Sequence, residues 1–89
     1  MAEATIEIIN KLGLHARAAS KLTALCGKFR SEIVFSKNGQ TANGKSIMAL
    51  MLLAAGKGTA LQVSCNGADE DEALAAVQAL FANRFDEAE

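Results

Sequence analysis

The stretch EIVFSKNGQTAN, residues 32–43, decides the fold of this chain. Two runs with the composition of β-strands, residues 32–37 and residues 40–43, are separated by Asn38-Gly39. Asn-Gly is the strongest short-range hairpin signal, because both turn residues tolerate positive φ. The stretch therefore predicts two adjacent antiparallel strands near the centre of the chain.

Apolar residues at helical spacing predict a helix on each side of this hairpin. Before it, residues 16–26 carry an apolar residue on every turn, and Gly27 stops the helix. After it, Ser46 is a suitable N-cap, because its side-chain oxygen can accept a hydrogen bond from a first-turn amide. This second helix is expected to run to about residue 55, with Gly56 in the left-handed cap position.

The outer parts of the chain predict two further strands and a third helix. Apolar and polar residues alternate over residues 4–9 and residues 60–66, as in half-buried strands. The third helix is expected to begin at Asp69, with Glu72 completing a capping box, and Arg84 places a base near its negative end. Its apolar stripe consists of Ala73, Leu74, Val77, Leu80, Phe81 and Phe85.

The predicted element order is β-α-β-β-α-β-α. Four half-buried antiparallel strands need one face covered, and three amphipathic helices are available to cover it. We therefore expect an α/β (α+β) two-layer, open-faced sandwich. A chain of 89 residues suits one domain, here residues 1–89.

Composition excludes several functional classes. The formal net charge of −1 argues against a nucleic-acid binder held by bulk charge. It divides into a net +5 over residues 1–57 and a net −6 over residues 58–89. Three of the four phenylalanines lie on expected core stripes, which leaves no aromatic platform for a small RNA-binding domain.

The chain also lacks the signals of a membrane protein, a secreted protein or a metalloprotein. The longest apolar run, residues 47–55, is about half of the ~20 residues that a membrane helix needs. No secretory signal is visible at the start, so we expect a cytoplasmic protein without membrane insertion. Cys26 and Cys65 have no metal-binding spacing, and we expect them to be reduced core thiols. No metal or other cofactor is expected.

His15 is the first candidate for chemistry. A lone histidine is usually an ordinary surface or core residue, but this one directly precedes the first helix. A helix N-terminus carries unpaired amides and about half a unit of positive charge, so it attracts anions and disfavours imidazolium. A mainly neutral, nucleophilic ring is therefore expected. Arg17 adds a forked cation suited to phosphate oxygens. Together they predict a pocket for a phosphoryl group.

The second helix is apolar almost all round, which a helix on a small sheet does not need. If one face packs on the sheet, then Met48, Leu52 and Ala55 cannot all be buried. The packed face would hold Ile47, Leu50, Met51 and Ala54. An exposed Met-rich patch favours a docking surface, with an oligomer contact or a wider core as alternatives. We expect the basic side chains near the two helix starts to gather and to steer an acidic partner, namely those of Lys11, Arg17, Lys21 and Lys45.

Two stretches, NKLGLHARAAS (residues 10–20) and NGKSIMALMLLAAGKG (residues 43–58), resemble the HPr family of histidine-containing phosphocarriers. These act in the bacterial phosphoenolpyruvate-dependent sugar phosphotransferase system. The resemblance covers essentially the whole chain and implies the sheet order 1-4-2-3. It implies that His15 accepts a phosphoryl group from enzyme I and passes it to the A components of enzyme II sugar permeases. Arg17 matches the arginine of the active-site motif.

The resemblance also implies regulation and docking. Ser46 matches a serine that a dedicated kinase modifies in many bacteria. The family's docking surface corresponds to Ser20, Ile47, Met48, Met51 and Leu52. Ala18 stands where the family motif has proline, a change we expect activity to survive. A monomer is expected. The segments EALAAVQALF and AAGKG also resemble the nitrogen-related branch of the family, NPr, and the choice of branch stays open, as does a non-catalytic regulatory adaptor.

Overall fold

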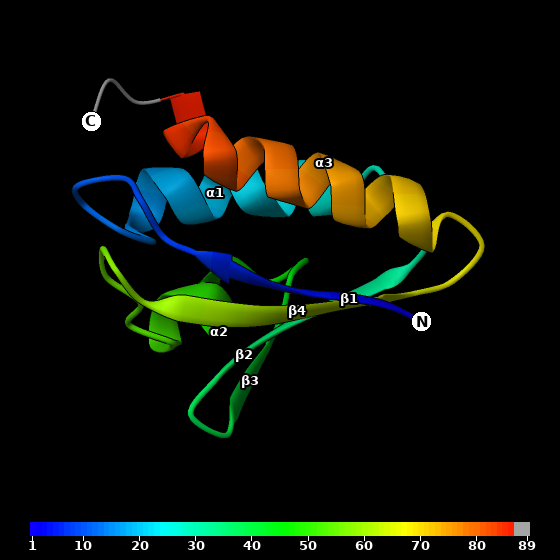
Figure 1. The fold of residues 1–89 in the computed structure, drawn as a ribbon, viewed down its shortest axis with the longest axis horizontal. Helices are drawn as coiled ribbons and strands as arrows, with labels where there is room; N and C mark the ends of the chain where they lie inside the picture. The colour runs from blue at the N-terminus through cyan, green and yellow to red at the C-terminus, as the bar shows by residue number, and fades with distance from the viewer. Residues whose placement is uncertain (87–89) are drawn as a thin grey trace.

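The central hairpin forms as predicted in the computed structural model, which describes residues 1–86 (Figure 1). Strands β2 (Glu32–Lys37) and β3 (Gln40–Asn43) pair antiparallel, with Lys37 opposite Gln40. Asn38 and Gly39 have φ values of +49° and +86°. Both turn residues therefore adopt the left-handed conformation that the Asn-Gly pair favours.

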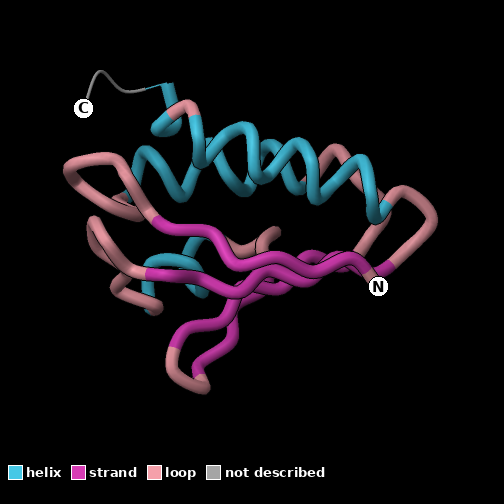
Figure 2. The backbone as a smooth tube through the Cα atoms, viewed as in Figure 1, coloured by secondary structure: helices cyan, strands magenta, loops and turns pink. Residues whose placement is uncertain are grey.

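The remaining strands and the helices build two layers around this hairpin. Strands β1 (Ala2–Glu7) and β4 (Ala60–Asn66) complete an antiparallel sheet in the order β1-β4-β2-β3. Figure 2 shows the two longer helices, α1 (Ala16–Cys26) and α3 (Glu70–Ala82), lying over the strands. The short α2 (Ile47–Leu52) packs against β3 and α1. The expected open-faced sandwich and its strand order are confirmed. Strand β1 is shifted by two residues towards the N-terminus, because it spans residues 2–7 and not the predicted residues 4–9.

Alternation along β4 shows how the sheet divides its faces. Leu61, Val63 and Cys65 are buried beneath the helices, whereas Gln62 and Ser64 lie on the uncovered face. Residues that face each other across the strands form polar rows on that face, for example Thr5, Gln62, Ser36 and Thr41. The sheet thus faces the core on one side and solvent on the other, as an antiparallel sheet can.

Helix α2 differs from its prediction in length and in orientation. It ends at Leu52, and Ala54 rather than Gly56 adopts the left-handed conformation, with φ +52°. Ile47 and Met51 are exposed instead of facing the sheet, because α2 packs through Leu50 and Leu53. Ala55, which we expected near the exposed side, is also buried, whereas Ala54 is exposed.

The predicted capping box at the start of α3 is wrong. Asp69 is the N-cap residue, but its side chain makes no cap hydrogen bond. Its carboxylate instead accepts hydrogen bonds from the Arg30 amide at 2.9 Å and from the Ser31 amide and hydroxyl at 2.9 and 2.6 Å. The carboxylate therefore ties the α1–β2 loop to the start of α3, a long-range contact that sequence spacing does not reveal.

The end of α3 also departs from the prediction. The helix ends at Ala82, so Arg84 and Phe85 belong to a following 3₁₀ turn, η1 (Arg84–Asp86), and both have φ +53°. Arg84 therefore lies beyond the last turn of α3. Phe85 is nevertheless buried as expected, because the left-handed turn folds its ring back onto Phe81, with ring centroids 4.8 Å apart.

The Asp69 clamp predicts a specific pH dependence of stability. Hydrogen bonds from Ser31 and from the Arg30 amide lower the pKa of Asp69 to about 2. A carboxylate with a lowered pKa contributes stability above its unfolded pKa of about 3.9, and this contribution disappears as the pH falls through about 2. Asp69→Asn should therefore lower the urea midpoint at neutral pH, and the difference from the unmodified protein should shrink as the pH approaches 2.

Asp71→Asn, a change at an exposed acid in the same helical turn, provides the matched control and should leave the urea midpoint almost unchanged. A difference between Asp69→Asn and the unmodified protein that stays constant with pH would contradict this assignment.

Candidate functional site

His15 occupies the N-cap position of α1. Its backbone is extended, with φ −78° and ψ 178°, and its carbonyl accepts the first helical hydrogen bond, from the Ala19 amide at 2.8 Å. The imidazole makes no cap hydrogen bond to the helix and is partly exposed. A helix that begins in this way directs first-turn amides and the positive end of its dipole towards the space beside the ring. This arrangement suits an anion held next to His15.

The loop before His15 has a defined shape. Asn10 is buried, its side-chain amide donates to the Gly13 carbonyl at 2.8 Å, and the Gly13 amide donates back to the Asn10 carbonyl at 3.2 Å. Sequence reasoning did not single out Asn10. A usable signal was an asparagine directly after the predicted strand of residues 4–9 and three residues before a glycine, a pattern that favours a closed turn.

The same loop is seated on the segment that follows α2. The Leu14 amide donates to the Ala55 carbonyl at 2.9 Å. Gly13 has φ +66°, and a Cβ atom there would lie 2.6 Å from the Ala55 oxygen and 2.7 Å from the Gly56 Cα. Only glycine permits this approach of two backbones. The position of His15 is therefore fixed by the end of α2 as well as by α1.

Helices α1 and α2 run in opposite directions along their contact. The His15 end of α1 lies against the segment after α2, whereas Lys45, before α2, donates its side-chain ammonium to the Phe29 carbonyl after α1, at 2.8 Å. The two helix starts therefore lie at opposite ends of the pair. The expectation that the basic side chains gather at neighbouring helix starts is wrong for Lys45, and Lys21 points to the Phe85 carbonyl, at 2.8 Å.

Ser46 caps α2 as predicted. Its hydroxyl oxygen accepts a hydrogen bond from the Ala49 amide at 3.3 Å, and the residue is partly exposed. Because α2 has six residues, it is about 9 Å long, and it separates Ser46 from the segment that seats the His15 loop. The structure therefore does not bring Ser46 and His15 into one pocket.

The exposed side of α2 is apolar, and we call it the α2 face. It consists of Ile47, Met48, Met51 and Leu52, with 42%, 72%, 43% and 74% of their surfaces exposed. Arg17 and Ser20 are exposed on α1, the helix that α2 contacts. Leu12, in the loop before His15, is also 67% exposed and was missed by sequence reasoning. Exposed apolar side chains at this density are typical of protein interfaces.

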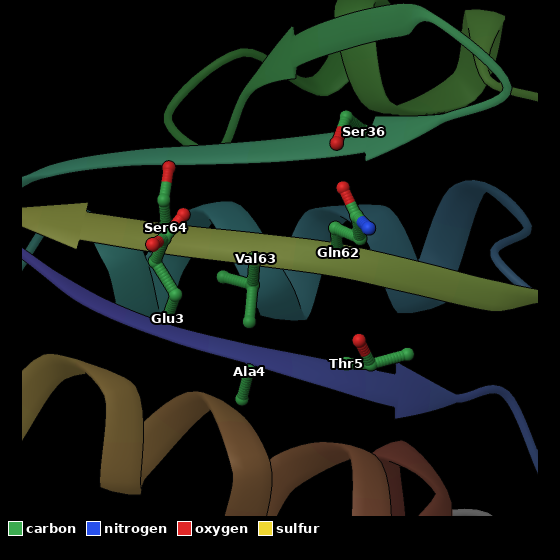
Figure 3. A pocket seen from close by; sticks show the side chains of 7 residues that line it. All are labelled: Glu3, Ala4, Thr5, Ser36, Gln62, Val63 and Ser64. Carbon is green, nitrogen blue, oxygen red and sulfur yellow. The ribbon is translucent and has the colours of Figure 1, made fainter.

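A shallow hollow of about 350 Å³ lies elsewhere, on the uncovered face of the sheet (Figure 3). Hydroxyl, amide and carboxylate side chains of β1, β2 and β4 line most of it. None of the candidate site residues contributes to this hollow, and no histidine, lysine or arginine is among the residues that line it. It therefore takes no part in the site around His15.

Three further features bear on the excluded classes. Cys26 and Cys65 are both buried as free thiols, and burial raises the pKa of Cys26 to about 12 and also raises the pKa of Cys65. Within residues 1–86, no three His, Cys, Asp or Glu side chains are grouped to hold a metal ion. Among the helices of the same residues, none has the length and apolarity required to cross a membrane.

Comparison with known proteins identifies relatives over the full length. A family model described as "PTS HPr component phosphorylation site" matches residues 2–83. The phosphocarrier protein HPr of Neisseria meningitidis serogroup A is 52% identical over 89 residues, with 100% of each chain covered. The phosphocarrier protein NPr of Escherichia coli K12 is 46% identical over 84 residues, 93% of each chain.

The fold agrees with these matches. The crystal structure of HPr-C-His from Thermoanaerobacter tengcongensis superimposes with a TM-score of 0.95 at 42% identity, covering 98% of each chain. The relatives of the present chain are named phosphocarrier proteins, which carry phosphoryl groups and are not catalytic enzymes. The family model, the full-length sequence identity and the shared fold together show that the chain belongs to the HPr family of phosphocarrier proteins of the phosphotransferase system.

Proposed function

We propose that His15 receives a phosphoryl group from enzyme I and passes it to the A components of sugar-specific enzyme II. One observation carries this proposal: His15 is a partly exposed histidine at the N-terminus of α1, where an anion is favoured. It lies within the residues that match a family model described as a phosphorylation site. Its protein partners have to reach the ring from solvent, in keeping with its partial exposure.

The transfer is a displacement between two imidazoles. A lone pair on a ring nitrogen of neutral His15 attacks the phosphorus carried by a histidine of enzyme I. A nitrogen–phosphorus bond forms on His15 while the one on enzyme I breaks, and its electron pair returns to the departing imidazole. No carboxylate base is needed, because the neutral ring already has a free lone pair. The reverse displacement delivers the group to the next protein.

Arg17 and the first-turn amides of α1 are proposed to hold the phosphoryl oxygens. Each charge-assisted hydrogen bond contributes about 1.5–3 kcal/mol. Arg17 is exposed, so water screens its charge and keeps the attraction moderate. A carrier has to release its cargo, and a few exposed contacts suit reversible transfer better than a buried cage.

The α2 face and Ser20 are proposed to dock both partners. The net charge of +5 over residues 1–57 favours an acidic partner, since complementary charge accelerates encounter. Ser46, at one end of the α2 face, is proposed as the target of a regulatory serine kinase. Phosphorylation there adds about −1.5 to −2 charges at neutral pH. We propose that the chain acts as a monomer in the cytoplasm.

The nitrogen-related pathway is the second candidate. It is supported by the 46% identity to a relative named NPr, beside 52% to one named HPr. The chemistry at His15 is the same in both pathways, so the partners distinguish them. Phosphorylation by the first enzyme of the sugar system at a higher kcat/KM than by its nitrogen-related counterpart supports the sugar branch, and the opposite ranking supports NPr.

His15→Ala tests the proposed acceptor directly. Incubation of the unmodified protein with phosphoenolpyruvate and enzyme I should produce acid-labile phosphate on His15, located by mass spectrometry. His15→Ala should show none, because the nucleophilic nitrogen is gone, while its circular dichroism stays unchanged. If His15→Ala retains the acid-labile label, His15 is not the acceptor. If the unmodified protein takes up no label, the non-catalytic adaptor is favoured.

Arg17→Ala should slow phosphoryl transfer to His15. Loss of one charge-assisted hydrogen bond of about 1.5–3 kcal/mol corresponds to roughly a 10- to 100-fold lower kcat/KM. Arg30→Ala removes a base beyond the other end of α1 and is the matched control. Equal rates for the Arg17 and Arg30 variants in quenched-flow transfer from phosphorylated enzyme I would argue against a role for Arg17.

Ser46→Asp should slow transfer from enzyme I by about tenfold without unfolding the protein. The introduced charge lies at the N-terminus of α2, which tolerates an anion, but it opposes an acidic partner that docks on Met48 and Met51. Ser36→Asp places the same charge on the uncovered face of the sheet and should leave the rate unchanged. If both variants transfer at the unmodified rate, docking does not involve this end of α2.

A further inference from the structure

We propose that Lys37 positions the loop that carries His15, acting through the turn that ends α2. The proposal rests on the proposed function of His15 as the phosphoryl acceptor. It concerns a residue on β2, outside both sequence stretches that resemble the family motifs. The path from Lys37 to His15 runs through the α2–β4 segment, residues 53–59, which the Lys37 side chain binds at one point and the backbone of the His15 loop at the next.

The first step is the contact between Lys37 and the end of α2. Its ammonium donates to the Leu53 carbonyl at 2.9 Å and to the Ala54 carbonyl at 3.3 Å. Leu53 is the C-cap residue of α2 and Ala54 follows it. Carbonyls at a helix C-terminus lack helical partners and carry partial negative charge, so a lysine there supplies both a donor and a cation. Lys37 thus provides the cation at this helix end, because the last turn of α2 contains no basic residue.

The second step is the backbone conformation at Ala54. This residue has φ +52°, in the left-handed region that residues other than glycine adopt only at a cost in free energy. Here the chain leaves α2, and the amides of Leu53 and Ala54 form tight bonds to the carbonyls three residues earlier, at 3.2 and 3.1 Å. The Lys37 ammonium donates hydrogen bonds to the carbonyls of Leu53 and Ala54, the same two residues, and so stabilises the left-handed turn.

The third step is the contact with the His15 loop. The residue after the turn, Ala55, is buried and directs its carbonyl at the Leu14 amide, at 2.9 Å. Gly13 lies against the same peptide so closely that no Cβ atom would fit. A turn that relaxed at Ala54 would move this carbonyl, and the loop with His15 would move with it. Small displacements of a reacting group have large kinetic effects, of the order of 100-fold for 1 Å.

The test compares Lys37→Met, which keeps the length of the side chain, with Lys37→Arg, which keeps a donor. Lys37→Met should lower kcat for transfer from enzyme I by about tenfold while KM changes little, because the α2 face is intact. It should also shift the Leu14 amide and the His15 ring signals in NMR spectra. Lys37→Arg should restore both the rate and the signals.

Lys21→Met is the matched control for stability. It removes another lysine bond to a backbone carbonyl, that of Phe85 at 2.8 Å, far along the chain from the α2–β4 segment. It should lower the unfolding midpoint comparably and leave the Leu14 amide signal in place. Ala54→Gly removes the cost of the left-handed turn, so Lys37→Met combined with Ala54→Gly should recover the rate and keeps the test usable if the single variant unfolds.

Unchanged kcat and unchanged Leu14 and His15 signals in Lys37→Met would overturn the inference. So would a loss in Lys37→Met that Lys37→Arg and Ala54→Gly both fail to recover. Failure of this inference can be distinguished from failure of the proposed function. The proposed function fails when the unmodified protein takes no phosphate on His15. The NMR readout of the Leu14–Ala55 contact requires no phosphate at all.

Discussion

The seating of the Gly13–Leu14 peptide on Ala55 is the contact on which the site depends. It joins the loop before α1 to the segment after α2, two parts of the chain about 40 residues apart. The approach leaves no space for a side chain at Gly13, and its hydrogen bond uses a buried carbonyl. Because of this contact, the loop that carries His15 is held by the segment after α2 as well as by α1, although His15 itself is partly exposed.

The opposed directions of α1 and α2 arrange the surface around that contact. The α2 face lies between the two ends of a short helix, one seating the His15 loop and the other capped by Ser46. In the docking arrangement that we propose, a partner covering this face would reach both ends, so a charge at Ser46 would affect docking without touching the histidine. One small helix thereby combines an exposed apolar face with support for the loop that carries His15. Its exposed apolar side chains contribute little to the core, which uses Leu50 and Leu53 instead.

Much of this was predictable from local patterns. The bounds of α1, β2, β3 and β4 agree with the sequence analysis, since each follows a clear period and ends at a turn residue. The N-cap position of Ser46 was predictable for the same reason. The end of α2 was not, because an apolar run to residue 55 gives no local sign of stopping at Leu52. The chain leaves the helix there through a left-handed Ala54, where Lys37 of β2 binds the Leu53 and Ala54 carbonyls.

The start of α3 shows the same limit. Asp69 and Glu72 have the spacing of a capping box, yet the Asp69 carboxylate binds the α1–β2 loop instead. Phe85 was assigned to the core by helical spacing and reaches it through a left-handed turn. In both cases the residue type was informative, but local spacing revealed neither the distant partners of Asp69 nor the left-handed turn that brings Phe85 onto Phe81.

The sequence by itself determined the element order, the two-layer class, the family resemblance and the histidine at the head of the first helix. Each of these depends on residue type and on spacing within a short window. Only the tertiary structure decided which way α2 presents its apolar side, that its two ends lie by opposite ends of α1, that Ala55 binds the loop of His15, and that Lys37 binds the carbonyls just after α2. These features depend on contacts between residues far apart in sequence, whose free energies exist only once the sheet and helices have packed.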